Sequence, residues 1–494
     1  MDDRNLVGEF LREKIAGYEF RPRVASYGKV VSFSDGVTFV EGLRDVGCDE
    51  IIDFGENRYG LAFELSEEGV GVVMLTPGSL IPGTLALGTG HIADIGVGDA
   101  MIGRVIDPLG RPLDGKPLRL TKYRHDESPA PKITDRSPVN RAFPTGILAI
   151  DSMIPIGKGQ RELIVGDRRT GKTSIALSAI KNQKGRGVIC VYCTIGQRAA
   201  ETVRLVEELR KSDALDYTFV VAATASDPAA LQYLAPFAAT GAAEYFMYSG
   251  NDVMIVYDDL SKHAAAYRTI SLLLKRPSGR EAYPGDIFYL HSRLLERSAQ
   301  LSRNNGGGSL TAFPIIETQA EDVSAYIPTN VISITDGQIY VSTSLFLGGQ
   351  RPAINVGLSV SRTGGAAQQK QLKKLSASLR IELSRMREQE KFARYGGNTG
   401  GDMAEGKLLN SLLIQSKDTI YSAAEEAAIL AAYRCGAFSS VPLNRIGEAI
   451  TKMLADLHEN DRALLENIEA SGNITDTNLD ALIGAVKRYL TSYC

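Results

Sequence analysis

The sequence has no excess of basic residues, few cysteines and no long apolar run. Each of these absences excludes a class of function or location. Its 494 residues carry 55 Lys and Arg against 58 Asp and Glu, a formal net charge of −3. This balance argues against nucleic acid as the main partner, because few positive charges remain to neutralise phosphates. No run of 18 apolar residues is present. We therefore expect no transmembrane helix, and a membrane link only through partner chains.

Cysteine is scarce, with five residues in the chain. Cys190 and Cys193 form a C-x-x-C spacing, but they lie in the apolar run 188–193, which is typical of a buried strand. Residues three apart in a strand face opposite sides, so we expect core thiols in a reducing compartment rather than a metal or redox pair. Residues 1–5 lack an apolar signal core and are acidic early, unlike a transit peptide.

What the chain does contain is a glycine-rich loop around which the rest is organised. Residues 166–173 fit the phosphate-loop pattern G-x-x-x-x-G-K-[ST]. The two glycines allow a tight turn that points several N–H groups at one anion. The lysine adds a charge for the β- and γ-phosphates, and the threonine offers a hydroxyl to Mg²⁺. Residues 162–165 predict a buried strand, and 174–180 predict a helix whose positive N-terminus faces the same anion. The residues predicted to bind nucleotide phosphates are Gly166, Asp167, Arg168, Arg169, Thr170, Gly171, Lys172 and Thr173.

A second motif supplies a carboxylate for the metal. Residues 253–257 form an apolar run that ends in Asp258-Asp259. Such a run is usually just a strand meeting a turn. With a phosphate loop upstream, a carboxylate at the end of a strand is typical of a Mg²⁺ site that acts through bound water. We therefore predict that Asp258 is the metal carboxylate.

The pattern along the chain predicts three domains. Residues 1–93 combine a helical pattern over 1–20, which could dock a partner or pack on its own domain, with short strands and an Asp35-Gly36 hairpin turn. We expect a small β-barrel there. Residues 94–365 alternate strands and helices, which predicts an α/β domain with a largely parallel sheet. Residues 366–494 predict an all-α bundle. The strands expected in the central domain are 161–165, 187–193, 217–222, 253–257, 313–317, 331–334 and 339–342.

The helices of the last domain follow from apolar spacing. Leu372 to Met386 step by three and four residues. Further helices are expected near 405–415, 422–433, 442–457 and 460–470. Thr477 and Asp480 have the spacing of a capping box that begins a last helix ending near Tyr489.

With these residues in view, the chain resembles the alpha-subunit family of the F-type (rotary) ATP synthase over essentially its full length. The matching blocks, in order, are GDRRTGKT at 166–173, YDDLSK at 257–262, REAYPGD at 280–286, FYLHSRLLER at 288–297, IETQ at 316–319, SAYIPTNVISITDGQ at 324–338 and NVGLSVSR at 355–362.

The resemblance implies a ring of three alpha and three beta subunits around a rotating gamma subunit. Beta would make or hydrolyse ATP, coupled to ion translocation, while alpha would bind Mg-ATP or Mg-ADP at regulatory sites that do not turn over. A peripheral-stalk or delta-type subunit would bind the N-terminal helix. The expected location is peripheral, on the cytoplasmic side of a bacterial inner membrane or, less in favour, in an organelle.

Gln197 supports a silent site. The catalytic sister chains carry Gly-Glu-Arg where this chain reads Gly196-Gln197-Arg198. A glutamine can hydrogen-bond the attacking water but cannot accept its proton. A glutamine does assist attack in some GTPases, so Gln197 indicates a non-catalytic site only in combination with the resemblance.

Arg362 is the residue whose function the resemblance indicates most clearly. The resemblance implies that Arg362 reaches into a beta catalytic site as an arginine finger and stabilises charge on the transferred phosphoryl group. A lysine would replace it poorly, because the planar fork is lost. By the same register Ser333 is expected to face that shared site.

For the chain's own nucleotide, the resemblance implies that Asp258 and Glu317 hold water on Mg²⁺, and that Arg351, Pro352 and Gln415 frame the base. Two positions depart from the family pattern. Arg169 stands where the family usually has Gln, which could tighten phosphate binding. Gln415-Ser-Lys replaces Gln-Gly-Gln, which puts base selectivity in doubt.

Three alternatives remain. A self-sufficient catalytic hexameric ATPase of the flagellar or type III secretion kind shares the core, but it would need Glu at position 197. A ring helicase would also need a basic channel. A structural subunit with a decayed site is disfavoured by the intact Lys172, Thr173 and Asp258.

Overall fold

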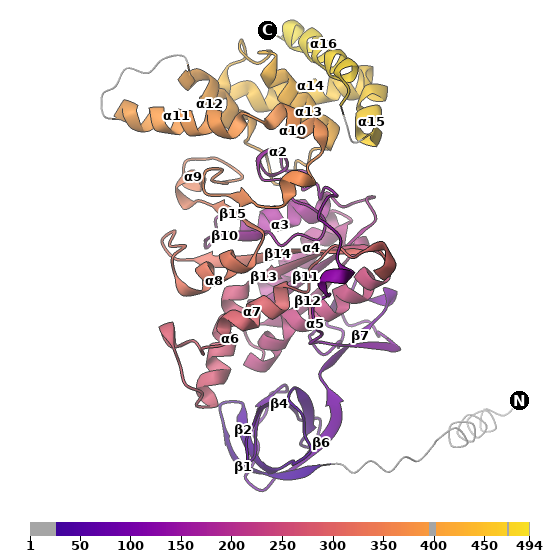
Figure 1. Ribbon diagram of the computed structural model, residues 1–494, viewed down its shortest axis with the longest axis vertical. Coiled ribbons are helices and arrows are strands. Elements are labelled where there is room, and N and C mark those ends of the chain that lie inside the picture. Colours follow the sequence, from indigo (N-terminus) through magenta and orange to yellow (C-terminus); the bar gives the residue numbers. More distant parts are fainter. Residues whose placement is uncertain (1–25, 395–401, 472–473, 494) are drawn as a thin grey trace, which may run out of the picture. The chain divides into compact units, whose positions relative to one another are not determined.

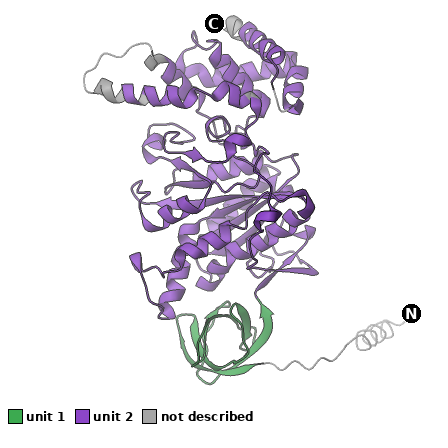
Figure 2. Cartoon of the chain, in the orientation of Figure 1, with its two compact units in different colours: residues 1–92 green, residues 93–494 purple. Residues whose placement is uncertain are grey.

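The computed structural model describes residues 26–394, 402–471 and 474–493. The chain divides into two compact units, residues 1–92 and 93–494, which Figure 2 colours separately. The helix expected over residues 1–20 lies outside the described residues and stays a prediction. The boundary expected near 365 does not coincide with a break between the two units, and a separate third domain likewise stays a prediction.

The first unit is a closed antiparallel barrel in the order β1-β2-β5-β4-β3-β6. Asp35 and Gly36 both have positive φ, 50° and 80°, which suits the tight turn between β1 and β2. Alternating side chains from the strands fill the interior, among them Val30, Val40 and Val72. The predicted barrel is confirmed. Its strands are β1 Tyr27–Ser34, β2 Val37–Gly42, β3 Glu50–Asp53, β4 Tyr59–Leu65, β5 Val70–Met74 and β6 Leu85–Ile92.

The second unit is built on an eight-stranded sheet in the order β16-β15-β10-β14-β13-β11-β12-β8. Neighbouring strands pair in parallel, except that the edge strand β16 pairs with β15 antiparallel. The central strands read as continuous apolar runs because helices cover both faces of a parallel sheet. The predicted largely parallel α/β fold is confirmed. The strands are β8 Val105–Ile106, β10 Leu163–Asp167, β11 Val188–Gln197, β12 Thr218–Thr224, β13 Asp252–Asp258, β14 Ser309–Thr318, β15 Gly337–Val341 and β16 Val360–Ser361, and β7 Asp94–Val97 pairs with β9 Lys122–His125 in a separate ribbon.

Helices flank this sheet, and more helices follow it (Figure 1). One continuous hydrophobic core joins the sheet to the C-terminal helices, since Ile164 of β10 and Leu430 of α13 belong to the same cluster. The flanking helices are α2 Leu148–Met153, α3 Lys172–Lys181, α4 Ala199–Lys211, α5 Ala229–Tyr248, α6 Leu260–Leu273, α7 Ile287–Leu295, α8 Tyr326–Ile334 and α9 Thr343–Leu347. The C-terminal helices are α10 Lys370–Ser376, α11 Leu379–Arg394, α12 Asp402–Leu412, α13 Ala423–Arg434, α14 Ile446–Asn460, α15 Arg462–Ser471 and α16 Asp476–Tyr493.

The predicted strand at 331–334 is wrong, because these residues form the second half of helix α8. The run is rich in β-branched residues, which favour strands in isolation. Ile327 and Val331 lie one helical turn apart and are both buried, so tertiary packing decides for the helix. Pro328 sits in the first turn, where its missing N–H costs nothing.

The C-terminal helices confirm one prediction in a divided form and correct another. The apolar repeat over 372–386 spans two helices, α10 and α11, which are separated at Ala377 and Ser378. The last helix begins one residue before Thr477, and Thr475 rather than Thr477 accepts a bond from Asn478 N, at 3.1 Å. Cys190 and Cys193 of the C-x-x-C spacing are both buried free thiols, which confirms the prediction that they belong to the core.

Candidate functional site

The phosphate loop lies between the end of β10 and the start of α3, as the sequence predicts. Gly171 has φ +102°, a left-handed conformation that favours glycine. A Cβ on Gly166 would lie 2.2 Å from the carbonyl oxygen of Val341, so only glycine fits beside β15 there. Arg169 adopts φ 64°, so a non-glycine residue also occupies the left-handed region of the loop.

Lys172 is turned back onto its own loop. Its Nζ donates to the carbonyl oxygens of Gly166 and Asp167 at 2.8 and 2.6 Å. The side chain is buried, and this burial lowers the pKa of Lys172, while nearby carboxylates such as Glu317 oppose the shift. The ammonium is therefore held at the mouth of the loop by carbonyl groups, an arrangement that an incoming phosphate can replace.

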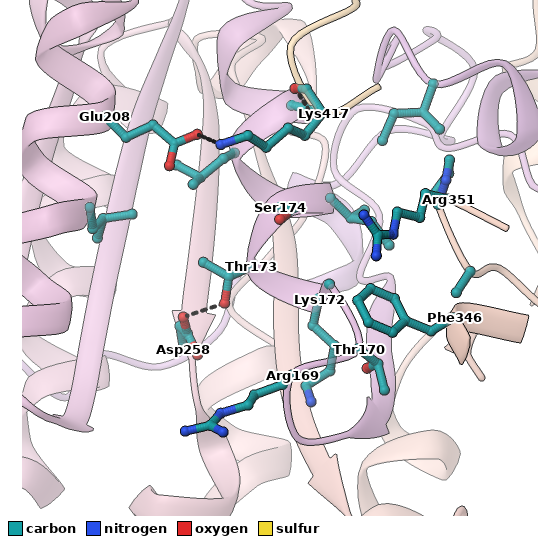
Figure 3. Close-up of a pocket in the computed structure, with 18 of the residues that line it drawn as sticks. Arg169, Thr170, Lys172, Thr173, Ser174, Glu208, Asp258, Phe346, Arg351 and Lys417 are labelled. Carbon is teal, nitrogen blue, oxygen red and sulfur yellow. Dashed lines mark hydrogen bonds and ion pairs between the residues drawn. The ribbon is translucent and has the colours of Figure 1, made fainter. Parts of the chain in front are cut away.

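A cavity of about 980 Å³ opens beside the loop. Figure 3 shows Lys172 and Thr173 in the middle of the view, with Asp258 on one side of them and Phe346 and Arg351 on the other. Because the parallel strands end at one edge of the sheet, residues far apart in sequence meet there. Of the predicted site residues, those that line the cavity are Arg168, Arg169, Thr170, Gly171, Lys172, Thr173, Gln197, Asp258, Glu317, Arg351, Pro352 and Gln415.

Asp258, at the end of β13, is buried and closely bonded. Its Oδ2 accepts from the Tyr192 hydroxyl at 2.6 Å and from Thr173 Oγ1 at 3.3 Å, a contact drawn in Figure 3. Burial raises the pKa of Asp258, although these donors oppose the shift. The neighbouring Asp259 begins α6 by accepting from the backbone N of Lys262 at 2.8 Å, and burial raises its pKa to about 7. The effect of burial on the pKa of both carboxylates thus outweighs the stabilisation that they receive from Lys262 and from neighbouring donors.

Gln197, the last residue of β11, reaches the same carboxylate. Its Nε2 donates to Asp258 Oδ1 at 3.0 Å, and its Oε1 accepts from Lys262 Nζ at 2.6 Å. The opposite orientation of the amide would set donor against donor and acceptor against acceptor, so both neighbours fix this one. The sequence singled out Gln197 but gave no sign of its contact with Lys262.

Two residues far apart in sequence, Gln415 and Phe346, also line the cavity. Gln415 lines the cavity, but its Nε2 donates to the carbonyl oxygens of Gly146 and Thr419 at 2.6 and 2.9 Å, and its Oε1 accepts from Leu148 N at 3.1 Å. Its polar atoms therefore bind main chain. Sequence reasoning missed Phe346 of α9, which lines the cavity.

Three charged residues, Arg351, Lys417 and Glu208, also line the cavity. The guanidinium of Arg351 stands 4.8 Å from the centroid of the Phe346 ring. Lys417, which replaces the family's second glutamine, makes an ion pair with Glu208 at 4.0 Å (Figure 3).

Two predicted loop residues, Gly166 and Asp167, do not line the cavity. The Asp167 carboxylate instead accepts from Thr318 Oγ1 at 2.6 Å, from Glu321 N at 2.9 Å and from Thr343 Oγ1 at 3.0 Å. These partners hold the pKa of Asp167 below its usual value against the effect of burial. Asp167 is thus bonded to the segment after β14 and to the start of α9.

Arg362 and Ser333 do not line this cavity. Arg362 contacts the helix that carries Ser333. Both are exposed. Arg362 follows the edge strand β16, and its Nη2 donates to the carbonyl oxygen of Ile332 in α8 at 3.1 Å. Ser333 Oγ donates to Asn330 O at 2.7 Å. The chain therefore presents Arg362 outward, beside the C-terminal end of α8.

Among the residues that the structure describes, no helix is long and apolar enough to span a bilayer. Two family models match the chain: the nucleotide-binding domain of the ATP synthase alpha/beta family over residues 146–361, and the C-terminal domain of the ATP synthase alpha/beta chain over residues 368–489.

A curated relative matches at full length. ATP synthase subunit alpha of Caldanaerobacter subterraneus subsp. tengcongensis is 49% identical over 495 aligned residues, which cover 99% of this chain and 97% of the relative. The phosphate loop, the sheet-edge carboxylate and both domain matches agree with this likeness. The chain therefore belongs to the alpha subunits of the ATP synthase alpha/beta family.

Proposed function

We propose that this alpha-type chain binds Mg-ATP or Mg-ADP without hydrolysing it, as a regulatory site, and lends Arg362 to the catalytic site of a neighbouring beta subunit. The observation that carries the proposal is Gln197. It occupies the place beside the phosphate loop where hydrolysis needs a proton acceptor, and its amide is bonded at both ends.

The residues around the loop fit a nucleotide phosphate group. Lys172 can exchange its loop carbonyl partners for β- and γ-phosphate oxygens, because it lies at the mouth of the loop. The N-terminus of α3 adds backbone N–H groups and a positive dipole end. Lys172 and the N-terminus of α3 thereby compensate the phosphate charge, and neither of them acts as a base in hydrolysis.

The residues also fit Mg²⁺. Hydroxyl and carboxylate oxygens are the ligands that this ion prefers, and the Thr173 hydroxyl stands 3.3 Å from Asp258. Thr173 would bind the ion directly, while Asp258 and Glu317 would hold it through water. When bound, Mg²⁺ neutralises phosphate charge and offsets the crowding of carboxylates at this edge of the sheet.

Arg362 is exposed and lies outside the chain's own cavity, which supports a role in another subunit's site. Its guanidinium donates to the carbonyl oxygen of Ile332 at the end of α8, a contact that a partner phosphate can replace. Ser333 lies next to the carbonyl group that Arg362 contacts and would border the same interface. We place the chain in a ring of three alpha and three beta subunits around a gamma subunit.

The remaining assignments follow from the family. The N-terminal segment would bind a peripheral-stalk or delta-type subunit. The complex would synthesise or hydrolyse ATP in step with ion translocation, peripheral to the cytoplasmic side of a bacterial inner membrane. The alternative, a self-sufficient hexameric ATPase of the flagellar or type III secretion kind, is disfavoured by Gln197 and by the full-length likeness to alpha subunits.

Steady-state ATP hydrolysis tests the proposal. The chain alone should be silent, and a ring reconstituted with beta and gamma should be active. Arg362→Ala should cost the ring roughly a thousandfold or more, and Arg362→Lys should recover little of it. Arg462→Ala is the matched control, because Arg462 forms an exposed ion pair with Glu466 within α15. Robust turnover by the chain alone, abolished by Lys172→Ala, would revive the secretion-type alternative.

A further inference from the structure

Lys262 contacts the residue that keeps the site silent. It lies in the first turn of α6, and its Nζ is 2.6 Å from Gln197 Oε1 and 3.5 Å from Asp259 Oδ2. Its side chain is 30% exposed, so the ammonium keeps part of its hydration. This ammonium is the group that selects which end of the Gln197 amide faces which neighbour.

Gly196 makes the contact possible. It has φ +59°, and a Cβ there would lie 3.2 Å from Lys262 Cδ and 2.8 Å from Gln232 Oε1. The Lys262 stem therefore packs against a bare backbone just before Gln197. Gly196 therefore leaves the space that the Lys262 side chain occupies at the end of β11.

The polar contacts form a series of hydrogen bonds that all run in one direction from donor to acceptor. The Lys262 ammonium donates to Gln197, Gln197 donates to Asp258, and Asp258 also accepts from Tyr192 and Thr173. Every donor in this series meets an acceptor. The amide oxygen of Gln197 is therefore directed toward Lys262 rather than toward a water on a terminal phosphate.

We propose that Lys262 is a positioning residue that enforces the non-catalytic state by directing the group at position 197 away from the attacking water. A carboxylate at 197 would meet the same ammonium and be held and charge-compensated in the same direction. The glutamine alone is thus not the whole reason for silence, and restoring a carboxylate alone should not restore hydrolysis. This inference rests on the proposed function, since it assumes that nucleotide occupies the cavity.

The test uses a ring whose beta subunits are inactivated by substitution of their own phosphate-loop lysine. Gln197→Glu alone should stay at the background rate. Gln197→Glu with Lys262→Met should raise ATP hydrolysis by about a hundredfold or more, the contribution of a freed general base. In that step the water oxygen bonds to the γ-phosphorus, and the bond to the bridging oxygen breaks with its electrons passing to ADP. The water's proton passes to the introduced carboxylate.

Two controls separate positioning from damage to the fold. Gln197→Glu with Lys262→Arg restores a cationic donor and should be silent again. Lys262→Met alone should bind ATP as the parent ring does and should not hydrolyse it. The gain in the first double variant should appear in kcat with an unchanged half-saturating ATP concentration, which a loosened structure would not give.

Several results would overturn the inference. One is turnover by Gln197→Glu alone as fast as by the double variant with Met, and another is equal turnover with Met and Arg at 262. A Met double variant that stays at background, or that fails to bind ATP, also contradicts it. If the parent ring holds no nucleotide in this chain, which a bound-nucleotide assay shows, the proposed function fails instead.

Discussion

At the scale of single residues, Phe346 is the side chain whose removal should most change how the cavity holds a base. Stacking of a base on an aromatic ring contributes about 1–3 kcal/mol. We therefore expect Phe346→Ala to weaken ATP binding by about tenfold, measured by titration of the full chain with a fluorescent ATP analogue.

Leu347→Ala provides the control for this substitution. Leu347 neighbours Phe346 in α9 but is 79% exposed and does not line the cavity. Its replacement should leave ATP affinity unchanged. Equal affinities of the Phe346 variant and the unaltered chain would show that the ring does not contact the base.

The sequence predicts some of these residues and not others for a physical reason. Lys172, Thr173 and Asp258 were predictable, because a local pattern and the ends of parallel strands fix their places. Phe346 carries no such pattern, since it reaches the cavity only through the packing of α9. That Gln415 frames the base stays a prediction, and no local pattern could reveal its bonds to main chain more than 260 residues away.

At the scale of elements, the Asp167 carboxylate ties the phosphate loop to two other segments. It accepts from the segment that follows β14 and from Thr343 of α9. Glu321 in turn accepts from Thr343 N at 2.6 Å and Ser342 Oγ at 2.9 Å at the start of α9. The loop and the helix that carries Phe346 are therefore held by one network of charged acceptors.

We expect Asp167→Ala to weaken Mg-ATP binding by roughly tenfold and to lower the midpoint of thermal unfolding. Removing this charged acceptor takes away the partner of several part-buried donors, at a cost of about 1 kcal/mol. Equilibrium binding and thermal unfolding of the full chain measure both effects.

Asp322→Ala is the matched control for this loop. Its carboxylate is exposed and accepts from the backbone N and Oγ of Ser324, within the segment between β14 and α8. It should change neither quantity. If Asp167→Ala behaved like Asp322→Ala, the hydrogen bonds of Asp167 between the phosphate loop and α9 would contribute nothing to binding or to stability.

The elements themselves were largely predictable where strands are long and apolar, as in β11 and β13. Helix α8 was not, because its β-branched run favours a strand locally and only the burial of Ile327 and Val331 selects the helix. The break between α10 and α11 leaves the apolar spacing intact, so the spacing alone could not reveal it.

At the scale of the whole molecule, a buried carboxyl pair links α2 to the C-terminal helices. Asp151 of α2 accepts from Thr145 N and Gly146 N at 2.9 and 2.8 Å, which favours its charged form, while burial raises its pKa to about 6. Burial and the nearby Asp151, Glu469 and Glu425 raise the pKa of Glu426 in α13. Burial and the neighbouring carboxylates thus favour the protonated form of Glu426.

This pair should make stability fall as pH rises. The unfolded chain releases both protons near pH 4, whereas the folded chain keeps them to higher pH. The stabilisation is thus fully present below about pH 4 and is lost from there through pH 6 and above, as the folded groups titrate. Glu426→Gln removes one titration, so we expect it to raise the thermal midpoint at pH 8 by a few degrees relative to its effect at pH 5.

Glu459→Gln removes an exposed carboxylate from the neighbouring helix α14 and should show no such pH-dependent difference. Thermal unfolding of the three proteins at both pH values makes the comparison. A pH-independent effect of Glu426→Gln would mean that Glu426 is ionised in the folded chain.

The central claim, that the chain holds nucleotide without hydrolysing it, is tested most directly by the fate of bound ATP. Labelled ATP is loaded with Mg²⁺ on the full chain alone, and the bound nucleotide is analysed over time. We predict about one ATP per chain that stays ATP, and loss of binding in Lys172→Ala. Steady conversion of the bound ATP to ADP and phosphate would contradict the account.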